Sequence, residues 1–210
     1  KIQLYKAYNE QEEAQQVVQT IQKLMNEEDR KLNDFAILYR TNAQSRVMED
    51  VLVKSSMNYQ IVGGTKFYDR KEIKDLLAYL RLIANNDDDL SLARIINEPK
   101  RAIGATSFEK MALYAFEQDR SIFDAMQELV FMGVTGRAAA AADKFYTMIQ
   151  SLSARQEQLS VTAIVEEVIG KSGYRAMLEG EKSIEAQSRL ENIEEFLTVT
   201  QAFEKRSEDQ

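Results

Sequence analysis

The strongest constraint on the fold of this chain is a change in its hydrophobic pattern near residue 90. Before this point, short apolar or alternating segments typical of β-strands alternate with longer segments of helical periodicity. After it, every patterned segment has helical periodicity. The single proline, Pro99, stands where a helix is expected to stop. The sequence therefore predicts an α/β part followed by an all-α part, with a boundary close to residue 100.

Three strands are predicted in the first part. Residues 1–8 alternate apolar and polar side chains, residues 35–39 form a continuous apolar run, and residues 59–62 end at two glycines. A continuous apolar run is typical of a strand that is covered on both faces. Together with the helices between them, these segments predict a β-α-β-α arrangement.

Helices are predicted along the rest of the chain. In the first part they lie at residues 10–28, 43–54 and 69–84. In the second part they lie near residues 90–97, 106–118, 121–129, 136–155, 161–170 and 184–204. The helix at 69–84 is amphipathic, and its apolar face consists of Ile73, Leu76, Leu77, Leu80 and Ile83.

The amino-acid composition makes several classes of function improbable. The chain has no cysteine and no histidine, so it lacks thiolate chemistry, disulfides and the commonest general base and metal ligand. No apolar stretch approaches the roughly 20 residues that a membrane span requires. Residues 1–8 have no apolar centre of the kind found in signal peptides. These features predict a cytoplasmic protein that does not enter a membrane.

The net charge is −7, which taken alone argues against nucleic-acid binding, because phosphate contacts need local positive potential. The charges are unevenly distributed, however. Acidic side chains crowd residues 179–195, whereas basic side chains gather at residues 66–74 and 94–101. The local distribution therefore matters more than the sum.

The first candidate site, residues 38–46, lies where a predicted strand passes into a predicted helix. In open α/β sheets, ligands bind at that end of a strand. Arg40 can pair with a phosphate, and Thr41 and Asn42 can donate from their side chains. The alternative is that Asn42 only caps the helix while Arg40 and Arg46 are solvated charges. The residues by themselves leave both interpretations open.

The second candidate site is residues 59–70. Gly63 and Gly64 allow the backbone to approach a ligand closely. Cations in this segment can neutralise phosphates, and its aromatic rings can stack on bases. These side chains are Lys66 and Arg70, and Phe67 and Tyr68. The alternative is an ordinary turn in which Phe67 returns to the core, and the glycines match neither nucleotide-binding loop pattern.

The third candidate site is the segment 97–109. A helix ends before Pro99, a compact turn follows, and Thr106 with Glu109 matches a capping box that begins the next helix. Such a helix–hairpin–helix offers backbone N–H groups and two cations, Lys100 and Arg101, to a phosphate backbone without reading bases. An ordinary helix connection with Ile103 in the core explains the same pattern.

The acidic run Asp87-Asp88-Asp89 is not interpreted as a metal site. Three consecutive carboxylates do not share one face of a helix, and acidic side chains favour the N-terminal end of a helix dipole. The run is therefore expected to initiate the helix that follows. No residue of the chain is assigned as a metal ligand or as a catalytic group.

In order along the chain, several segments resemble the second motor domain of UvrD/Rep/PcrA-type superfamily 1 DNA helicases, with the PcrA group nearest. They are residues 35–46 (Phe-Ala-Ile-Leu-Tyr-Arg-Thr-Asn-Ala-Gln-Ser-Arg), 59–64, 67, 70–75, 78–81, 87–104, 161–173 and 184–192. The resemblance spans essentially the whole chain. It implies that residues 1–98 are part of a RecA-like domain with a parallel sheet. It also implies that residues 99–210 are most of an inserted helical accessory subdomain, truncated at its C-terminal end.

The resemblance also implies two sets of DNA contacts. Residues 38–46 match the motif that lines the track of single-stranded DNA, and the turn after Pro99 matches the Gly-Ile-Gly element that grips the duplex ahead of the fork. The expected single-strand contacts are Arg40, Thr41, Asn42, Arg46, Gly63, Gly64 and Phe67. The expected duplex contacts are Lys100, Arg101, Ile103, Gly104 and Thr106. Ala102 replaces the first glycine of that element. Its side chain argues against a close approach of DNA to the backbone there.

The resemblance finally implies an ATP-dependent 3′–5′ DNA helicase that acts in DNA repair and replication. Its phosphate-binding loop, its acidic Mg²⁺ site and its arginine that senses the γ-phosphate do not occur in this sequence. ATP and Mg²⁺ are therefore expected in the whole helicase and not on this chain, which alone should not hydrolyse ATP.

The expected partners are single-stranded DNA, duplex DNA, the remaining motor domains of the same polypeptide, and repair or replication proteins. The competing hypothesis is a protein-interaction module without appreciable DNA affinity, which the net charge of −7 favours.

Overall fold

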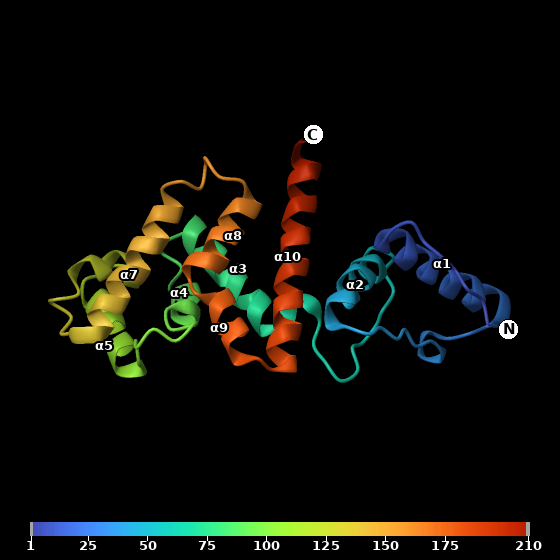
Figure 1. Ribbon diagram of the computed structural model, residues 1–210, viewed down its shortest axis with the longest axis horizontal. Helices are drawn as coiled ribbons and strands as arrows, with labels where there is room; N and C mark the ends of the chain where they lie inside the picture. The colour runs from blue at the N-terminus through green and yellow to red at the C-terminus, as the bar shows by residue number, and fades with distance from the viewer. Residues whose placement is uncertain (1, 209–210) are drawn as a thin grey trace. The chain divides into compact units, whose positions relative to one another are not determined.

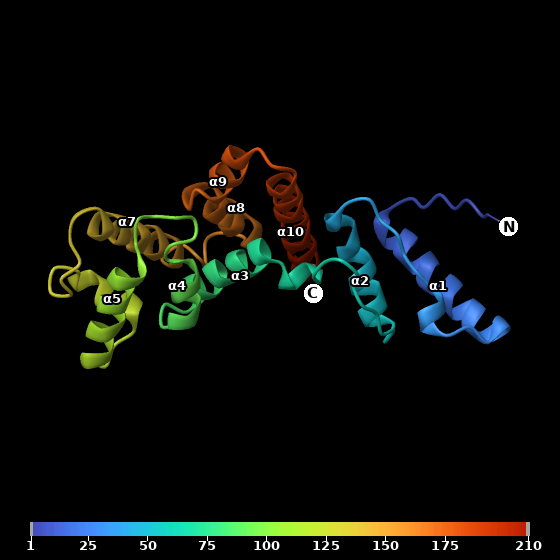
Figure 2. The same ribbon diagram turned by 90° about the horizontal axis from the view of Figure 1, so that it is seen from below.

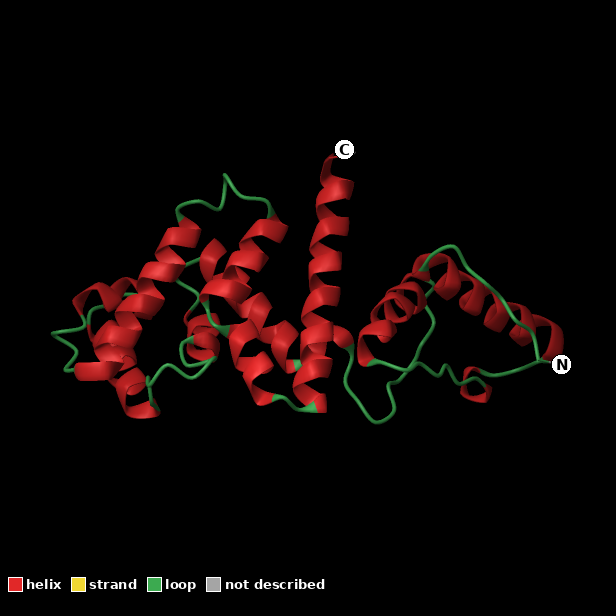
Figure 3. Ribbon diagram, in the orientation of Figure 1, coloured by secondary structure: helices red, strands yellow, loops and turns green. Residues whose placement is uncertain are grey.

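The computed structural model describes residues 2–208, and their regular secondary structure is helical (Figures 1 and 3). The chain divides into two compact units, Lys1–Arg70 (unit 1) and Lys71–Gln210 (unit 2). Each unit has a core of its own. In the part of the chain that the structure describes, no helix is long and apolar enough to cross a membrane.

Unit 1 is built on two helices, α1 and α2. α1 spans Glu10–Glu28, and α2 spans Ser45–Lys54. Asn9 starts α1, since its side-chain oxygen accepts the backbone N–H of Glu12 at 2.8 Å. Short 3₁₀ turns complete the unit: η1 (Leu32–Asp34), η2 (Asn42–Gln44) and η3 (Phe67–Asp69).

The core of unit 1 lies between α1 and α2. It contains Ala14, Val18 and Ile21 from α1, Val47, Val51 and Leu52 from α2, and Met57. Partly buried side chains from the connecting segments, including Phe35, Ile37 and Tyr59, pack against this cluster. The loops of unit 1 are therefore held mainly by side-chain packing on a pair of helices.

The prediction of a parallel sheet in the first part is wrong, because the described residues contain no strand (Figure 3). Residues 35–39 rest on the core of unit 1 through Phe35 and Ile37, while Leu38 is 93% exposed. The apolar run is thus covered on one face only. The continuous apolar run wrongly predicted coverage on both faces, and a sheet also needs backbone pairing with a neighbour, which no such pattern specifies. The fold is helical in both parts.

Unit 2 consists of eight α-helices and one 3₁₀ turn within the described residues. They are α3 (Lys71–Ala84), α4 (Asp89–Ile95), α5 (Ala105–Glu117), α6 (Ile122–Ala125), η4 (Met126–Glu128), α7 (Gly136–Ser153), α8 (Val161–Lys171), α9 (Tyr174–Glu181) and α10 (Ile184–Glu208). Their positions agree with the predicted helices to within a few residues. The exception is α9, which the periodicity did not reveal.

Helix α3 is the centre of unit 2. It packs against α4, α7, α8 and α10, and Figure 2 shows it between α4 and the group formed by α8–α10. Its apolar residues Ile73, Leu76, Leu82 and Ile83 are buried, whereas Leu77 and Leu80 of the predicted apolar face are only partly buried. Neighbouring helices therefore cover almost the whole circumference of α3. The sequence had predicted only one buried face, which is narrower than the buried surface of the helix.

A strip of buried polar side chains runs along α3. Glu72, Asp75 and Tyr79 are 3%, 1% and 0% exposed, respectively. Glu72 accepts a hydrogen bond from Asn192 of α10 at 2.6 Å. Asp75 accepts one from the Tyr174 hydroxyl of α9 at 2.7 Å. These contacts fix the positions of α9 and α10 on α3 more specifically than apolar packing does.

The division into compact units falls after Arg70. α3 and α4 were assigned by sequence to the first part. In the structure they pack with α7, α8 and α10 or with α6, because α3 is buried by the later helices. Packing therefore groups these two helices with the all-α part of the chain.

Replacing Asp75 tests this central role. Its carboxylate also pairs with Arg94 at 2.8 Å and with Lys71 at 3.1 Å. Asp75→Ala would leave the Tyr174 hydroxyl without its acceptor, so we expect the free energy of unfolding of unit 2 to fall by about 2–4 kcal/mol. Urea-dependent hydrogen exchange of the α3 amides measures this change. The control Asp143→Ala, at an exposed position of α7, should change it by less than about 0.5 kcal/mol. An equal effect of both substitutions would contradict the central role of Asp75 in unit 2.

Candidate nucleic-acid interface

Residues 40–46 form a capped turn at the start of α2. The side-chain oxygen of Gln44 accepts the backbone N–H groups of Arg40 at 2.9 Å and Thr41 at 3.2 Å. Asn42 is therefore not the residue that caps this turn. The side chains of Arg40 and Asn42 are exposed, and Thr41 is partly exposed. The turn presents these three neighbouring groups to solvent at the beginning of a helix.

Arg46 has a different environment. Its guanidinium pairs with Asp50, one turn later on α2, at 2.8 Å, and its side chain is only 13% exposed. The charge of Arg46 is thus already offset within unit 1. Of the two arginines predicted in this segment, Arg40 is the one that is available to a phosphate.

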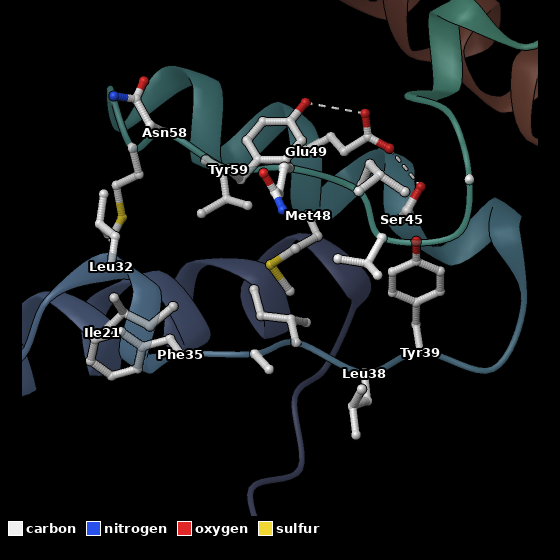
Figure 4. A pocket seen from close by; sticks show the side chains of 18 of the residues that line it. Ile21, Leu32, Phe35, Leu38, Tyr39, Ser45, Met48, Glu49, Asn58 and Tyr59 are labelled. Atoms are coloured by element: carbon white, nitrogen blue, oxygen red, sulfur yellow. Dashed lines mark hydrogen bonds between the residues drawn. The ribbon is translucent and has the colours of Figure 1, made fainter.

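A buried carboxylate joins the first and second candidate segments. Glu49 of α2, 6% exposed, accepts hydrogen bonds from the Ser45 hydroxyl at 2.6 Å and from the Tyr59 hydroxyl at 3.2 Å (Figure 4). It also accepts the backbone N–H of Phe67 at 3.2 Å. Burial, reinforced by the nearby Glu49 charge, raises the pKa of Tyr59 to about 12. Residues 40–46 and 59–67 are therefore parts of one structure.

The aromatic residues of the second segment face opposite ways. Phe67 is fully buried, and the exposed side of this segment instead carries Tyr68, which is 43% exposed. The two rings meet edge to face, with centroids 5.1 Å apart. Gly63 and Gly64 are exposed, and Gly63 has a φ of 76°, a left-handed conformation that glycine adopts without strain. The structure thus places Phe67 behind the surface that Tyr68 and the glycines form.

A hollow of about 1030 Å³ lies beside these two segments in unit 1 (Figure 4). Its lining includes Tyr39 and Asn42, residues 59–64, and Ser45 and Glu49. Of the predicted single-strand contacts, Asn42, Gly63 and Gly64 line this hollow, while Arg40 and Thr41 lie in the chain between the lining residues Tyr39 and Asn42.

The third candidate segment forms a turn that Asn97 organises. The Asn97 side-chain oxygen accepts the backbone N–H groups of Arg101 at 2.7 Å and Ile103 at 3.3 Å. Ile103 is 2% exposed and anchors the turn in the core, while Lys100 and Gly104 are exposed. Sequence reasoning missed Asn97, although an asparagine that bonds the backbone of a tight turn is a recognised pattern.

The guanidinium of Arg101 is directed into the protein. It donates to the carbonyl oxygens of Ile95 at 2.9 Å, Pro99 at 3.1 Å and Ser172 at 3.1 Å, and to the Tyr79 hydroxyl. Arg101 thereby links the end of α4, the turn and the end of α8. Of the two cations predicted to face a phosphate backbone, only Lys100 extends from the surface.

The start of α5 differs slightly from the prediction. The helix begins at Ala105, and its N-cap is Gly104, which has no side chain to cap it. Thr106 lies inside the first turn and is exposed, and the capping box predicted with Glu109 does not form. The first N–H groups of α5 are therefore not capped by a side chain of the N-cap residue.

The acidic run before α4 initiates that helix, as predicted. The Asp88 carboxylate accepts the backbone N–H of Ser91 at 3.0 Å, and its hydrogen bonds with Ser91 lower its pKa. Across residues 2–208, no group of three acidic side chains is arranged to hold a metal ion.

Comparison with known proteins gives a consistent result. The family described as UvrD-like helicase C-terminal domain matches residues 1–210. An ATP-dependent DNA helicase PcrA from Bacillus subtilis is 58% identical over 209 residues, which cover 100% of this chain and 28% of that protein. PcrA helicases from Staphylococcus epidermidis and Staphylococcus aureus are 52% identical over 207 residues, 99% of this chain and 28% of their length. The chain therefore spans less than a third of these curated relatives.

Replacing Glu49 tests the link between the two segments of unit 1. Glu49→Ala removes the acceptor of the Phe67 N–H, so hydrogen exchange at that amide should accelerate about 10- to 100-fold. The measurement is amide exchange followed by NMR. Asp50→Ala, the neighbouring carboxylate on α2, removes only the Arg46 pair and should leave the Phe67 amide unchanged. Unchanged protection in Glu49→Ala would show that the two segments are held by other contacts.

Replacing Ala102 tests the backbone of the third segment. Ala102 has a φ of 62°, a conformation that costs an L-residue about 1–2 kcal/mol. Ala102→Gly relieves this strain but adds freedom to the unfolded chain, so a net stabilisation of up to about 1 kcal/mol is expected in thermal or urea unfolding. The matched control, Ala140→Gly at an exposed position within α7, should destabilise by about 1 kcal/mol. If both substitutions changed the free energy of unfolding in the same direction, the backbone of Ala102 would not be strained.

Proposed function

Because the chain belongs to the UvrD-like helicase C-terminal domain family, we propose that it forms a DNA-contacting part of an ATP-dependent 3′–5′ DNA helicase. The observation that carries this proposal is the arrangement in unit 1, where two motif segments meet on one buried carboxylate and expose Arg40 beside a hollow. The curated relatives are named as helicases, and the family match covers every residue. The helicase is proposed to act in DNA repair and replication.

Single-stranded DNA is the proposed ligand of unit 1. Arg40 would pair with a backbone phosphate, and Thr41 and Asn42 would donate further hydrogen bonds. Tyr68 supplies an exposed ring on which a base can stack, and Gly63 and Gly64 allow the strand to approach the backbone closely. Phe67 would contribute from behind by packing against Tyr68, and Arg46 by its pair with Asp50, which links two turns of α2.

Duplex DNA is the proposed ligand of the turn before α5. Lys100 would neutralise a phosphate, and the uncapped start of α5, with Gly104 and Thr106, would donate to a phosphate oxygen. Arg101 and Ile103 act on this contact indirectly, because both are anchored in the protein. Such contacts hold a duplex without reading its sequence.

ATP and Mg²⁺ are proposed to bind elsewhere in the helicase. This sequence has no phosphate-binding loop pattern, and its described carboxylates do not group around a metal position. The remaining motor domains of the same polypeptide would therefore be obligatory partners in coupling hydrolysis to movement. Repair or replication proteins are proposed as further partners.

A protein-interaction module without DNA affinity is the second candidate, since the net charge of −7 favours it. The two functions respond differently to salt. Phosphate contacts release counterions, so DNA affinity falls steeply as salt rises, whereas docking through apolar surface responds weakly.

Fluorescence anisotropy of labelled single-stranded, duplex and junction DNA, over a salt series, tests the assignment. Arg40→Ala should weaken single-strand binding roughly 3- to 10-fold and reduce its salt slope by about 1, with little effect on duplex binding. Lys100→Ala should weaken duplex binding and reduce its salt slope, with little effect on single-strand binding. Lys144→Ala, an exposed lysine of α7 that lies outside both sites, is the charge-matched control and should change neither affinity by more than about twofold.

Three outcomes would count against this function. Equal losses in all three variants would show that binding is a property of the total charge. Binding without salt dependence would favour the protein-interaction module. If the unsubstituted chain did not bind DNA at low salt, these residues on their own would not contact DNA.

A further inference from the structure

Unit 2 contains a second hollow, of about 730 Å³, on a part of its surface that the proposed DNA contacts do not use. The segment before α4, the helices α4, α5 and α6, and the loop between α5 and α6 surround it. Four carboxylates line it, from Asp87, Asp89, Asp119 and Asp124. Its apolar wall includes Ala115, Ile122 and Phe116.

The negative charge of this hollow is only partly balanced. Arg120, its one basic lining residue, pairs with Asp124 and with Glu128, both at 2.7 Å. Asp89 accepts the backbone N–H of Ile122, the first residue of α6, at 2.8 Å, but that contact brings no full positive charge. Within residues 2–208, no ion pair involves Asp87, Asp89 or Asp119. Three carboxylates therefore remain electrostatically uncompensated around one concavity.

Large apolar side chains are exposed on the helices α4 and α5 that line the hollow. Phe116, which lines the hollow, is 83% exposed, and Leu113, one turn earlier on α5, is 59% exposed. Leu90 follows Asp89 directly and is 87% exposed. Exposed apolar side chains with polar groups around them mark many protein-binding surfaces.

We propose that this surface, formed by the hollow with Phe116, Leu113 and Leu90 at its edge, binds a short segment of a partner protein that carries arginine or lysine beside a large apolar side chain. The cation would enter among Asp87, Asp89 and Asp119 and lie against the ring of Phe116, where a cation–π contact adds to the charge pairing. The neighbouring apolar side chain would cover Phe116 and Leu113.

Charge complementarity selects this occupant. Nucleic acid is disfavoured because its phosphates would meet uncompensated carboxylates. A second copy of this chain would carry the same net charge of −7, and repulsion between two such copies disfavours it as the occupant. A free polyamine would pair with the carboxylates but would leave Phe116 and Leu113 uncovered. The inference does not depend on the DNA contacts, and either can fail without the other.

The test is NMR titration of the ¹⁵N-labelled chain with three synthetic peptides of equal length. The first combines arginine and lysine with leucine and phenylalanine, the second replaces its basic residues by glutamate, and the third replaces its apolar residues by alanine. The first peptide should shift amides of residues 87–89 and 112–124 and bind at least tenfold more tightly than the other two. Spermine and a single-stranded oligonucleotide are added as competing probes.

Variants of the chain make the result specific. Phe116→Ala and the double variant Asp87→Asn/Asp119→Asn should each weaken the first peptide roughly five- to tenfold. These positions are exposed, so the fold should be retained, and unchanged spectra away from the hollow check this. Glu109→Gln, an exposed carboxylate of α5 outside the hollow, is the control and should leave the affinity within twofold.

Each contrary result rejects a defined part of the inference. Equal binding of the first and third peptides, or displacement by spermine with no effect of Phe116→Ala, would show a simple cation site. Shifts at the same amides on dilution of the chain alone would identify a second copy as the occupant, and shifts with the oligonucleotide would identify DNA. No shift with the first peptide would overturn the proposal.

Discussion

The arrangement of unit 2 depends on the polar strip of α3. Apolar burial drives helices together but is nearly indifferent to their exact register. Glu72, Asp75 and Tyr79 impose that register, because each is buried and each has its hydrogen-bond partner on a different element. Asn192 fixes α10, and Tyr174 fixes α9. A buried polar group left without its partner costs about 1–3 kcal/mol, so misaligned packings are disfavoured at each of these positions.

The same strip controls the candidate duplex-binding turn. The Tyr79 hydroxyl donates to the carbonyl of Glu98 at 2.7 Å and accepts from Arg101, whose guanidinium also reaches the end of α8. Burial raises the pKa of Tyr79 to about 12, so the hydroxyl keeps its proton well into the alkaline range. The exposed groups Lys100 and Gly104 are thus attached to the core through short, rigid contacts, and their geometry is set before any ligand arrives. Asp75 and Tyr79 lie one turn apart on α3, which couples the packing of α9 to the position of the turn.

The sequence predicted the helices well and the environment of individual polar groups poorly. Periodicity identified all the helices longer than eight residues, because it reports which side chains are apolar at each turn. It failed at residues 35–39, where burial of alternate side chains on helices resembles burial in a sheet. It could not distinguish Arg101 from Lys100 either, since the difference lies in carbonyl groups of Ile95 and Ser172 that approach only in the folded chain. Glu49 left no signal, because its partners come from the distant residues Tyr59 and Phe67.

Internal pairing of arginines explains how an acidic chain can present separate surfaces of opposite character. Arg46, Arg94 and Arg120 pair with carboxylates of their own unit, and Arg101 is held by carbonyl groups. These side chains add to the formal charge count without contributing much positive potential at a distance, because the partner lies within a few ångströms. Exposed cations such as Arg40 and Lys100 are left to meet a phosphate, and the carboxylates of Asp87, Asp89 and Asp119 lie on a different part of the surface. A net charge of −7 is therefore compatible with local phosphate binding, but it limits how strong that binding can be in these residues alone.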